Sequence, residues 1–536
     1  MDISFGSTKG YPACTPVLPD ELTDETDTAI YVLSRQAGEG KDRRVEKGDY
    51  LLSDVEANSL RLLPGHYRKL ILVLNCGGVI DLSVLDETRV DAVLFYGQGG
   101  MEGGNALADI LTGKVSPSGH LTDTWAMHYG DYPSAETFGH RNGDLENEEY
   151  AEGIYVGYHR WKEDVALMKQ MGLKSYRFSI SWSRVIPAEG KVNPAGLKFY
   201  SDLVDELIAA GIEPLVTIFH WDMPVWVYKK GGWLSEKIIP PFRDYTRVVV
   251  EALSDRVKWW IPMNEPGCFI MNGYMQGIHA PFRHNYLALS KLTRNCMLAH
   301  AESVKAVRKY ARQPVKVGIA FSTGAYVPEN ETPEEIEKAR CLSMEKGNGL
   351  MGNRWWMDPM LAGKPVRAYG IYASHQKDMD AIRQPLDFIG LNIYTSYNYA
   401  DWGGAQRPAP GTPRNALGWV IDERCMYWNV RFVYEKYGLP IMITENGLAA
   451  NDVVSRDGKV HDPQRTDFLH RYLGQLKRAI GEGIPVIGYQ HWSVMDNFEW
   501  AEGYDPRFGL VYVDFTTGKR ILKDSALEYK KMCLSA

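Results

Sequence analysis

A regular alternation of short apolar runs with longer amphipathic stretches extends from His159 to the C-terminus. This alternation is typical of parallel strands that are joined by right-handed helical crossovers. The apolar runs predict seven strands, at 174–182, 212–220, 258–264, 316–322, 386–394, 440–446 and 484–492. A helix precedes the first of them, so the segment is one strand short of a closed (β/α)8 barrel. We therefore expect an α/β fold, a TIM barrel that lacks its own first strand.

The residues before His159 have a different organisation. Apolar runs at 29–33, 69–75 and 91–97 predict buried parallel strands, with helical patterns between them and Ser53 as the N-cap of the first helix. These features predict a partial doubly wound α/β domain and a connecting segment over residues 1–158, followed by the barrel over 159–536. The stretch GQGGMEGG is out of register with G-x-G-x-x-G, so we predict no dinucleotide site there.

Charge and cysteine content narrow the class of function. The net charge of -7 and the isoelectric point near 6.1 disfavour nucleic acid or an anionic membrane as a partner. No apolar run approaches the roughly 18 residues that span a bilayer, and the first residues lack a signal-peptide pattern. The cysteines form no C-x-x-C pair, which favours free thiols in a reducing compartment. We expect a cytoplasmic protein with no cofactor and no metal.

Polar and aromatic residues recur at the carboxyl ends of the predicted barrel strands. In a parallel barrel these ends converge on one face, which is where active sites form. These polar and aromatic residues are Arg177 and Trp182 on the first strand, and His220, Trp221, Asn264, Glu265, Asn392, Tyr394, Glu445, Asn446 and Trp492 at the ends of later ones. Any one of them could serve as a helix cap or a solvated charge. Their recurrence at the same end of successive strands favours a functional site.

Two of these residues, Glu265 and Glu445, suggest a reaction. Cleavage of a glycosidic bond needs one carboxyl group that protonates the leaving oxygen. It needs a second carboxylate that attacks the anomeric carbon or activates water. The two glutamates follow different strands of the predicted barrel, so they are expected to face each other across its mouth. The pattern therefore favours glycoside hydrolysis.

From residue 159 onward the chain resembles the β-glucosidases of glycoside hydrolase family 1 over almost its whole length. The resemblance rests on YRFSISWSRVIP, FHWDMP, NEP, GLNIYTS, ITENG and HWSVMDNFEWAEGYDPRFGLVYVD. It implies that Glu265 is the acid/base and Glu445 the nucleophile of a retaining reaction. It also implies that Tyr394 hydrogen-bonds the nucleophile, that Arg177 stabilises its charge and that Asn264 holds the sugar 2-hydroxyl.

The resemblance also implies a subsite for the glycone, the sugar whose bond is cleaved. Its lining would include His220, Trp492, Glu499 and Trp500. Trp221 and Asn392, which also lie at strand ends, are included among the expected substrate-binding residues. A carboxylate at Glu499 would repel a phosphate, which disfavours 6-phospho-sugars.

One part of the family pattern is missing. Family 1 proteins begin with a strand that carries a sugar-binding Gln, and no such strand or Gln precedes GYHRW. We expect this loss to weaken glycone binding more than the chemistry. The segment EGIYVGY (152–158) is a candidate substitute for the strand. A segment of residues 1–158, or a second subunit, is expected to cover the exposed barrel edges.

Residues 27–158 resemble part of the α/β-sandwich domain of glycoside hydrolase family 3. The resemblance rests on GEGKDR, LILVLNCGGVIDLS, YGQGGMEGGNALADILTGKVSPSGHL and EGIYVGY. Glu39, in GEG, matches the position at which many members of that family keep their acid/base. The barrel that would supply its nucleophile partner is absent, so we expect Glu39 to be dispensable. The chain is similar to a fusion of two incomplete glycosidase folds.

The sequence therefore predicts a retaining exo-β-glycosidase, a β-D-glucosidase that acts on β-glucosides or short oligosaccharides. Two alternatives remain open. The missing strand could leave an impaired or inactive protein that only binds sugars. A remodelled pocket could instead favour another glycone or transfer to an acceptor other than water. The expected partner in each case is a small β-glycoside, and a homo-oligomer is the alternative way to cover the barrel edges.

Overall fold

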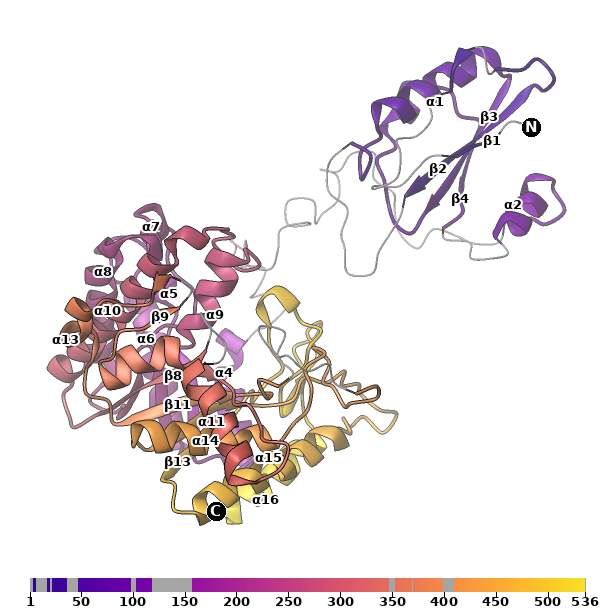
Figure 1. The fold of residues 1–536 in the computed structure, drawn as a ribbon. Helices are drawn as coiled ribbons and strands as arrows, with labels where there is room; N and C mark the ends of the chain where they lie inside the picture. The colour runs from indigo at the N-terminus through magenta and orange to yellow at the C-terminus, as the bar shows by residue number, and fades with distance from the viewer. Residues whose placement is uncertain are drawn as a thin grey trace. The chain divides into compact units, whose positions relative to one another are not determined.

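The computed structural model describes residues 3–5, 17–19, 22–35, 47–97, 103–117, 157–346, 352–368, 370–398 and 409–535. The chain divides into two compact units, Met1–His140 and Arg141–Ala536. Each unit is coloured along the chain in Figure 1. None of the described helices is long and apolar enough to cross a membrane.

The first unit contains a four-stranded parallel sheet in the order β1-β2-β3-β4. Its elements are β1 (Ile3–Phe5), β2 (Thr28–Arg35), α1 (Asp54–His66), β3 (Lys69–Cys76), the 3-10 helix Ser83–Asp86, β4 (Ala92–Phe95) and α2 (Gly103–Leu111). The predicted strands β2, β3 and β4 are confirmed, whereas β1 was not predicted. Three residues are too few for a recognisable apolar run, and β1 is defined by its pairing with β2.

Helices cover both faces of this sheet, as expected for a doubly wound arrangement (Figure 1). On one face, Leu60 and Leu63 of α1 pack with residues of β2 and β3. On the other face, Leu107 and Leu111 of α2 pack on Ile30, Val32 and Val73. The predicted N-cap of α1 is confirmed, because the Ser53 side chain accepts from the Glu56 backbone N–H in a capping box.

The second unit is built on a seven-stranded parallel sheet in the order β13-β12-β11-β8-β7-β6-β5. Its strands are β5 (Ser175–Ser179), β6 (Glu213–Thr217), β7 (Trp259–Ile261), β8 (Lys316–Thr323), β11 (Phe388–Ile393), β12 (Ile441–Asn446) and β13 (Val486–His491). All seven predicted strands are confirmed; β8 extends one residue beyond its apolar run, and the other six are shorter than theirs. Two small antiparallel pairs accompany them: β9 (Arg367–Ala368) with β10 (Ile371–Tyr372), and β14 (Val511–Val513) with β15 (Arg520–Leu522).

Helices separate the strands and surround the sheet (Figure 1). The longer ones are α4 (Gly157–Gln170), α6 (Pro194–Ala209), α8 (Ile239–Leu253), α10 (Leu289–Tyr310), α14 (Arg424–Tyr437), α15 (Pro463–Gly481) and α16 (Asp524–Ser535). Short helices are α5 (Trp182–Val185), α7 (Val225–Lys229), α9 (Pro266–Ile270), α11 (Pro333–Cys341), α12 (Asn353–Met357) and α13 (Met379–Ile382). One continuous hydrophobic core fills the space between the sheet and these helices.

The sheet has two end strands, β5 and β13, as expected for a barrel that lacks one strand. We call the space between them the seam. Every residue of the central strands β11 and β12 is buried, whereas no residue of β13 is fully buried and Ile487 is 42% exposed. One side-chain hydrogen bond spans the seam, from Gln490 Nε2 to Ser175 Oγ at 2.6 Å.

The proposed substitute for the lost strand, EGIYVGY, is only partly described. Its last two residues, Gly157 and Tyr158, begin the helix α4, so they do not belong to a strand. Residues 152–156 lie outside the described residues, as does Glu39. The expectation that a segment of residues 1–158 or a second subunit covers the barrel edges therefore stays a prediction.

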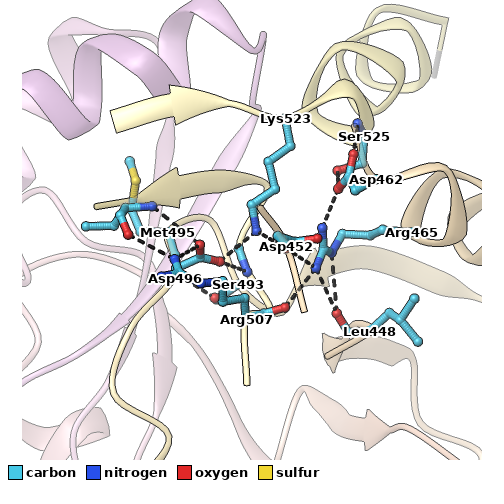
Figure 2. Close-up of polar contacts among 12 residues, drawn as sticks. Leu448, Asp452, Asp462, Arg465, Ser493, Met495, Asp496, Arg507, Lys523 and Ser525 are labelled. Atoms are coloured by element: carbon cyan, nitrogen blue, oxygen red, sulfur yellow. Dashed lines mark hydrogen bonds and ion pairs between the residues drawn. The ribbon is translucent and has the colours of Figure 1, made fainter. Parts of the chain in front are cut away.

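A buried cluster of ionic groups connects the C-terminal segments of the barrel (Figure 2). Lys523 Nζ donates to Asp452 Oδ2 at 2.5 Å and to Asp496 Oδ1 at 2.7 Å, and its side chain is fully buried. Arg465, on α15, is also fully buried and donates to Asp452 at 2.8 Å and to Asp462. Buried charges are tolerated where each is paired and hydrogen-bonded, so these segments are stable only in their joint arrangement.

Asp496 extends this cluster to the loop between β13 and β14 (Figure 2). Its carboxylate accepts from the Gly509 N–H at 2.9 Å and from Arg507 Nη1 at 2.7 Å. Its own N–H donates to the Val511 carbonyl at 3.0 Å. Both ends of the loop therefore meet at one buried carboxylate. The same loop carries Glu499 and Trp500, which the sequence places in the glycone subsite.

Removal of the Lys523 charge should destabilise the barrel strongly. The substitution Lys523→Met leaves Asp452 and Asp496 buried without that cation, and loss of one partner of a buried pair costs about 3–5 kcal/mol. Denaturant titration followed by tryptophan fluorescence measures the change in unfolding free energy. The matched control is Lys531→Met, whose Nζ lies 2.6 Å from Glu528 and whose side chain is 73% exposed. That change should cost less than about 1 kcal/mol. Equal losses in the two variants would contradict this account of the cluster.

Candidate active site

Glu265 lies in the short connection after β7 and is the N-cap of α9. Its backbone has φ 44° and ψ 64°, the left-handed region that a residue with a side chain rarely adopts. The Glu265 N–H donates to the Ala320 carbonyl on β8 at 2.8 Å, which holds this conformation. The side chain is buried, and its Oε1 accepts from Asn392 Nδ2 at 2.8 Å. Backbone strain of this kind concentrates at functional sites, where the surrounding structure maintains it.

Glu445 lies near the end of β12 and is also buried. One carboxylate oxygen, Oε1, accepts from Arg177 Nη1 at 2.6 Å. The other, Oε2, accepts from the Tyr394 hydroxyl at 2.9 Å. An ionic partner and a neutral donor therefore stabilise the charged form of this carboxylate in a buried place.

Arg177 connects the edge strand β5 with four other parts of the site. Besides Glu445, its guanidinium donates to Thr217 Oγ1 at 3.0 Å and to the Thr444 carbonyl at 3.1 Å. Its Nη2 donates to Asn264 Oδ1 at 2.6 Å. The Arg177 side chain is only 6% exposed, so these acceptors replace water around the cation.

Asn264 lies between the two glutamates and the aromatic side of the site. Its Oδ1 also accepts from Asn392 Nδ2 at 3.1 Å, and its Nδ2 lies 3.2 Å from His220 Nε2. The Asn264 carbonyl accepts from the Trp221 indole N–H at 3.1 Å. The two asparagines are therefore held by contacts within the site.

The environment of Glu265 differs from that of Glu445. Burial raises the pKa of Glu265 well above the ordinary value of a carboxyl group, and the charge of Glu445 raises it further. Burial is the larger of these two causes. It results from the contacts of Glu265 with Ala320 on β8 and with Asn392, which sequence spacing does not reveal. Glu265 therefore favours its protonated form at neutral pH, whereas Glu445 is paired with the Arg177 cation.

The neighbouring ring groups are neutral. Burial lowers the pKa of His220 to about 3, and the Arg177 charge lowers it further, so the imidazole is uncharged near pH 7. Burial raises the pKa of Tyr394 well above its usual range, with the charge of Glu445 as the next cause. Tyr394 therefore keeps its proton and remains a donor to Glu445.

Aromatic rings form one wall of the site. His220 stacks on Trp492 with ring centroids 5.8 Å apart and on Trp500 at 6.3 Å. The Trp221 and Trp500 rings are 4.9 Å apart. Flat rings of this kind stack on the C–H faces of sugars while nearby polar groups bind the hydroxyls. Burial raises the pKa of Glu499 to about 7, with the Glu445 charge as the next cause and a hydrogen bond from Trp492 opposing both.

The structure thus brings the residues of the proposed site into one connected set of contacts. Trp182, which was also predicted there, lies instead in the hydrophobic core, where it stacks on Tyr245. Sequence reasoning missed three other residues that support the site. Thr217 on β6 and Thr444 on β12, the residue before Glu445, each accept a hydrogen bond from Arg177. Cys268 hydrogen-bonds the Glu265 carboxylate, and its position three residues later on α9 was the available signal. Among the described residues, no group of three or more His, Cys, Asp or Glu side chains could hold a metal ion.

Comparison with known proteins gives two family matches along the chain. Residues 130–535 match the model of glycosyl hydrolase family 1, and residues 19–158 match the family 3 C-terminal domain. β-Glucosidase A of Thermotoga maritima is 40% identical over 404 residues, which are 74% of this chain and 90% of that protein. The 1,4-β-D-glucan glucohydrolase of Thermotoga neapolitana is 40% identical over the same shares of the two chains.

Solved structures give the same result. The family 1 β-glucosidase from Thermotoga maritima aligns with a TM-score of 0.64 at 40% identity, over 70% of this chain and 86% of that one. Its complex with deoxynojirimycin aligns equally well, with 87% of that chain covered. The family model covers about three quarters of the chain, and a relative that is 40% identical is covered to 90% of its length. The chain therefore belongs to glycosyl hydrolase family 1.

Proposed function

We propose that the barrel hydrolyses β-D-glucosides and short β-linked oligosaccharides with retention of anomeric configuration. The observation that carries this proposal is the contrast between two buried carboxyl groups. Glu445 is paired with a cation and a hydroxyl donor, whereas burial raises the pKa of Glu265. A retaining glycosidase needs this combination, one carboxylate that attacks and one acid that donates a proton.

In the first step, Glu445 attacks the anomeric carbon while protonated Glu265 gives its proton to the leaving oxygen. The bond to the leaving group breaks as the bond to the glutamate oxygen forms. Arg177 and Tyr394 orient Glu445 for this attack, because both of its oxygens are already held by their donors. Neutral His220 avoids a competing ion pair with the nucleophile.

In the second step, Glu265 is a carboxylate and acts as a base. It removes a proton from water as the water oxygen attacks the anomeric carbon and displaces Glu445. The sugar leaves with its original configuration, and Glu265 regains the proton for the next cycle. Asn392 supports both roles of Glu265, since its amide donates to the carboxyl group at 2.8 Å.

The remaining residues bind the glycone. Asn264 is assigned to the 2-hydroxyl, and the other groups that line this subsite are His220, Trp221, Asn392, Trp492, Glu499 and Trp500. The solved relatives include complexes with glucoimidazole and isofagomine lactam, and the similar proteins include β-glucosidases and 1,4-β-D-glucan glucohydrolases. These names support glucose as the preferred glycone. The intact contacts around both glutamates argue against the alternative of a protein that only binds sugars.

We also propose the cellular compartment, the domain boundary and the way in which the barrel edges are covered. The described cysteines are free thiols, which supports a reducing compartment such as the cytoplasm. We place the boundary between the family 3-like part and the barrel at 158/159, where the family 3 match ends. The division into two compact units lies earlier, at 140/141. The open edges of β5 and β13 support a covering segment or a second subunit, because unpaired strand edges invite association.

The two glutamates should be distinguishable by leaving group. Glu445→Gln removes the nucleophile and should abolish turnover of every aryl β-glucoside. Glu265→Gln removes the proton donor of the first step, which kcat/KM reports, so a glucoside with a poor leaving group should lose about 10²–10⁴-fold in kcat/KM. With a 2,4-dinitrophenyl leaving group, formation of the glycosyl-enzyme should be nearly unchanged. Stopped-flow release of the phenol measures this step, with the exposed Glu502→Gln as a matched control. The assignment of roles is wrong if Glu265→Gln affects all leaving groups equally.

The pH profile should carry the signature of Glu265. Because burial raises its pKa, the acid form persists above the ordinary carboxyl value of 4.5, and kcat/KM should fall only as pH rises through the raised value. In Glu265→Gln, kcat/KM for 2,4-dinitrophenyl β-glucoside should lose this alkaline limb and become flat there. Initial rates between pH 5 and 9 test the prediction. An alkaline limb that persists unchanged in Glu265→Gln would assign it to another group.

A further inference from the structure

The seam between β5 and β13 is part of a cavity that reaches the active site. The cavity has a volume of about 720 Å³. Drug-sized ligand sites range from about 300 to 1,000 Å³, so this one has room for more than a single sugar unit. Arg177, His220, Trp492 and Trp500 line one part of it, and these residues belong to the proposed catalytic and glycone groups. We call the remainder the seam cavity.

The seam cavity has the chemical character of a sugar site. Hydroxyl and amide groups face it from both end strands, namely Ser175, Ser179 and Gln490. Aromatic rings lie beside them, and these include Phe199, Tyr200, Phe498 and Tyr504. Sugar subsites combine stacking rings with several hydrogen-bonding groups in this way.

The direction of the seam cavity decides which part of a substrate can enter it. Its shared lining includes His220, Trp492 and Trp500, which belong to the proposed glycone subsite. Neither Glu265 nor Glu445, which act at the scissile bond, is among the described residues that line it. The cavity therefore extends from the glycone away from the scissile bond. In a complete barrel, a strand between β5 and β13 would occupy this space.

We propose that the seam cavity is a second sugar subsite, beyond the glycone on the non-reducing side. It would bind the outer glucosyl unit of a β-linked disaccharide. The enzyme would then cleave an aryl β-cellobioside at the aryl bond: Glu445 bonds to the inner anomeric carbon, the phenol leaves with the proton of Glu265, and water releases intact cellobiose. This inference rests on the proposed function and extends it from removal of single glucose units to release of a disaccharide.

A peptide strand is the other occupant that an open sheet edge could accept. Strands on either side of a third lie about 9–10 Å apart, twice the spacing of neighbours. Here the Gln490 and Ser175 side chains already span the seam with a 2.6 Å hydrogen bond, across the path that a strand would follow. A sugar needs only scattered donors and acceptors, and those are the groups that the cavity offers.

The test compares two substrates of the full-length enzyme, 4-nitrophenyl β-glucoside and 4-nitrophenyl β-cellobioside. The blocking variant is Ser179→Trp, because Ser179 is exposed, lines the cavity and ends β5. The matched control is Ile487→Trp, since Ile487 is 42% exposed on the other seam strand and is absent from the cavity lining. Ser175→Phe, deeper in the seam, is the second blocking variant if Ser179→Trp does not fold.

The unmodified enzyme should release nitrophenol and intact cellobiose in its first turnovers on the cellobioside. Ser179→Trp should lower kcat/KM for the cellobioside by about tenfold or more, equivalent to about 1.4 kcal/mol, while the glucoside changes less than about twofold. Ile487→Trp should change neither. The inference is overturned if glucose appears before nitrophenol, or if the blocking variants affect both substrates equally.

A separate measurement distinguishes failure of this inference from failure of the proposed function. If neither aryl substrate is hydrolysed, the proposed function fails, but sugar binding can still be measured by calorimetry. Glu445→Gln should bind 4-nitrophenyl β-cellobioside more tightly than the glucoside, and Ser179→Trp in that background should remove the difference. Equal affinities for the two compounds would overturn the second subsite whether or not the enzyme is active.

Discussion

The buried Arg177 guanidinium is the interaction on which the site depends. It comes from the end strand β5, yet it reaches Glu445 on β12, Asn264 after β7 and Thr217 on β6. A buried cation must be paired and hydrogen-bonded, so these elements have to take their places together around it. Its charge forms an ion pair with Glu445 and adds to burial, the larger cause, in lowering the pKa of His220. One side chain therefore orients the nucleophile, helps to keep the neighbouring imidazole neutral and joins the end strand β5 to β12.

A second ionic cluster supports the loop that carries part of the proposed glycone subsite. Lys523 and Asp496 are fully buried, and Asp496 holds both ends of the loop that carries Glu499 and Trp500. The glycone wall thus depends on charges that no substrate contacts. The hydrogen bonds and ion pairs of both clusters do not depend on the missing barrel strand, because all of their members come from the strands and loops that are present.

The sequence was sufficient for the strands and for the residues at their ends. Buried parallel strands are continuous apolar runs, and polar residues that interrupt them at one end are visible without a structure. The sequence was insufficient for features that depend on contacts between residues far apart in the chain. The strand β1 has three residues and is recognisable only through its pairing with β2. The main cause of the Glu265 pKa shift is burial, and Cys268 and Thr444 act through contacts that motif spacing does not encode. The segment 152–158 was expected as a strand, but Gly157 and Tyr158 already belong to α4.

The unequal burial of the barrel strands has a consequence for how the enzyme should fail on heating. Protection from hydrogen exchange is greatest where backbone amides are enclosed, and opening begins where they are not. β11 and β12 are enclosed on all sides, whereas β5 and β13 form the margins of the sheet. Local opening should therefore start at the margins and displace Arg177 and Trp492, while the strand of Glu445 is still native. Thermal inactivation would then precede global unfolding, so catalytic half-life and melting temperature would report on different parts of one barrel.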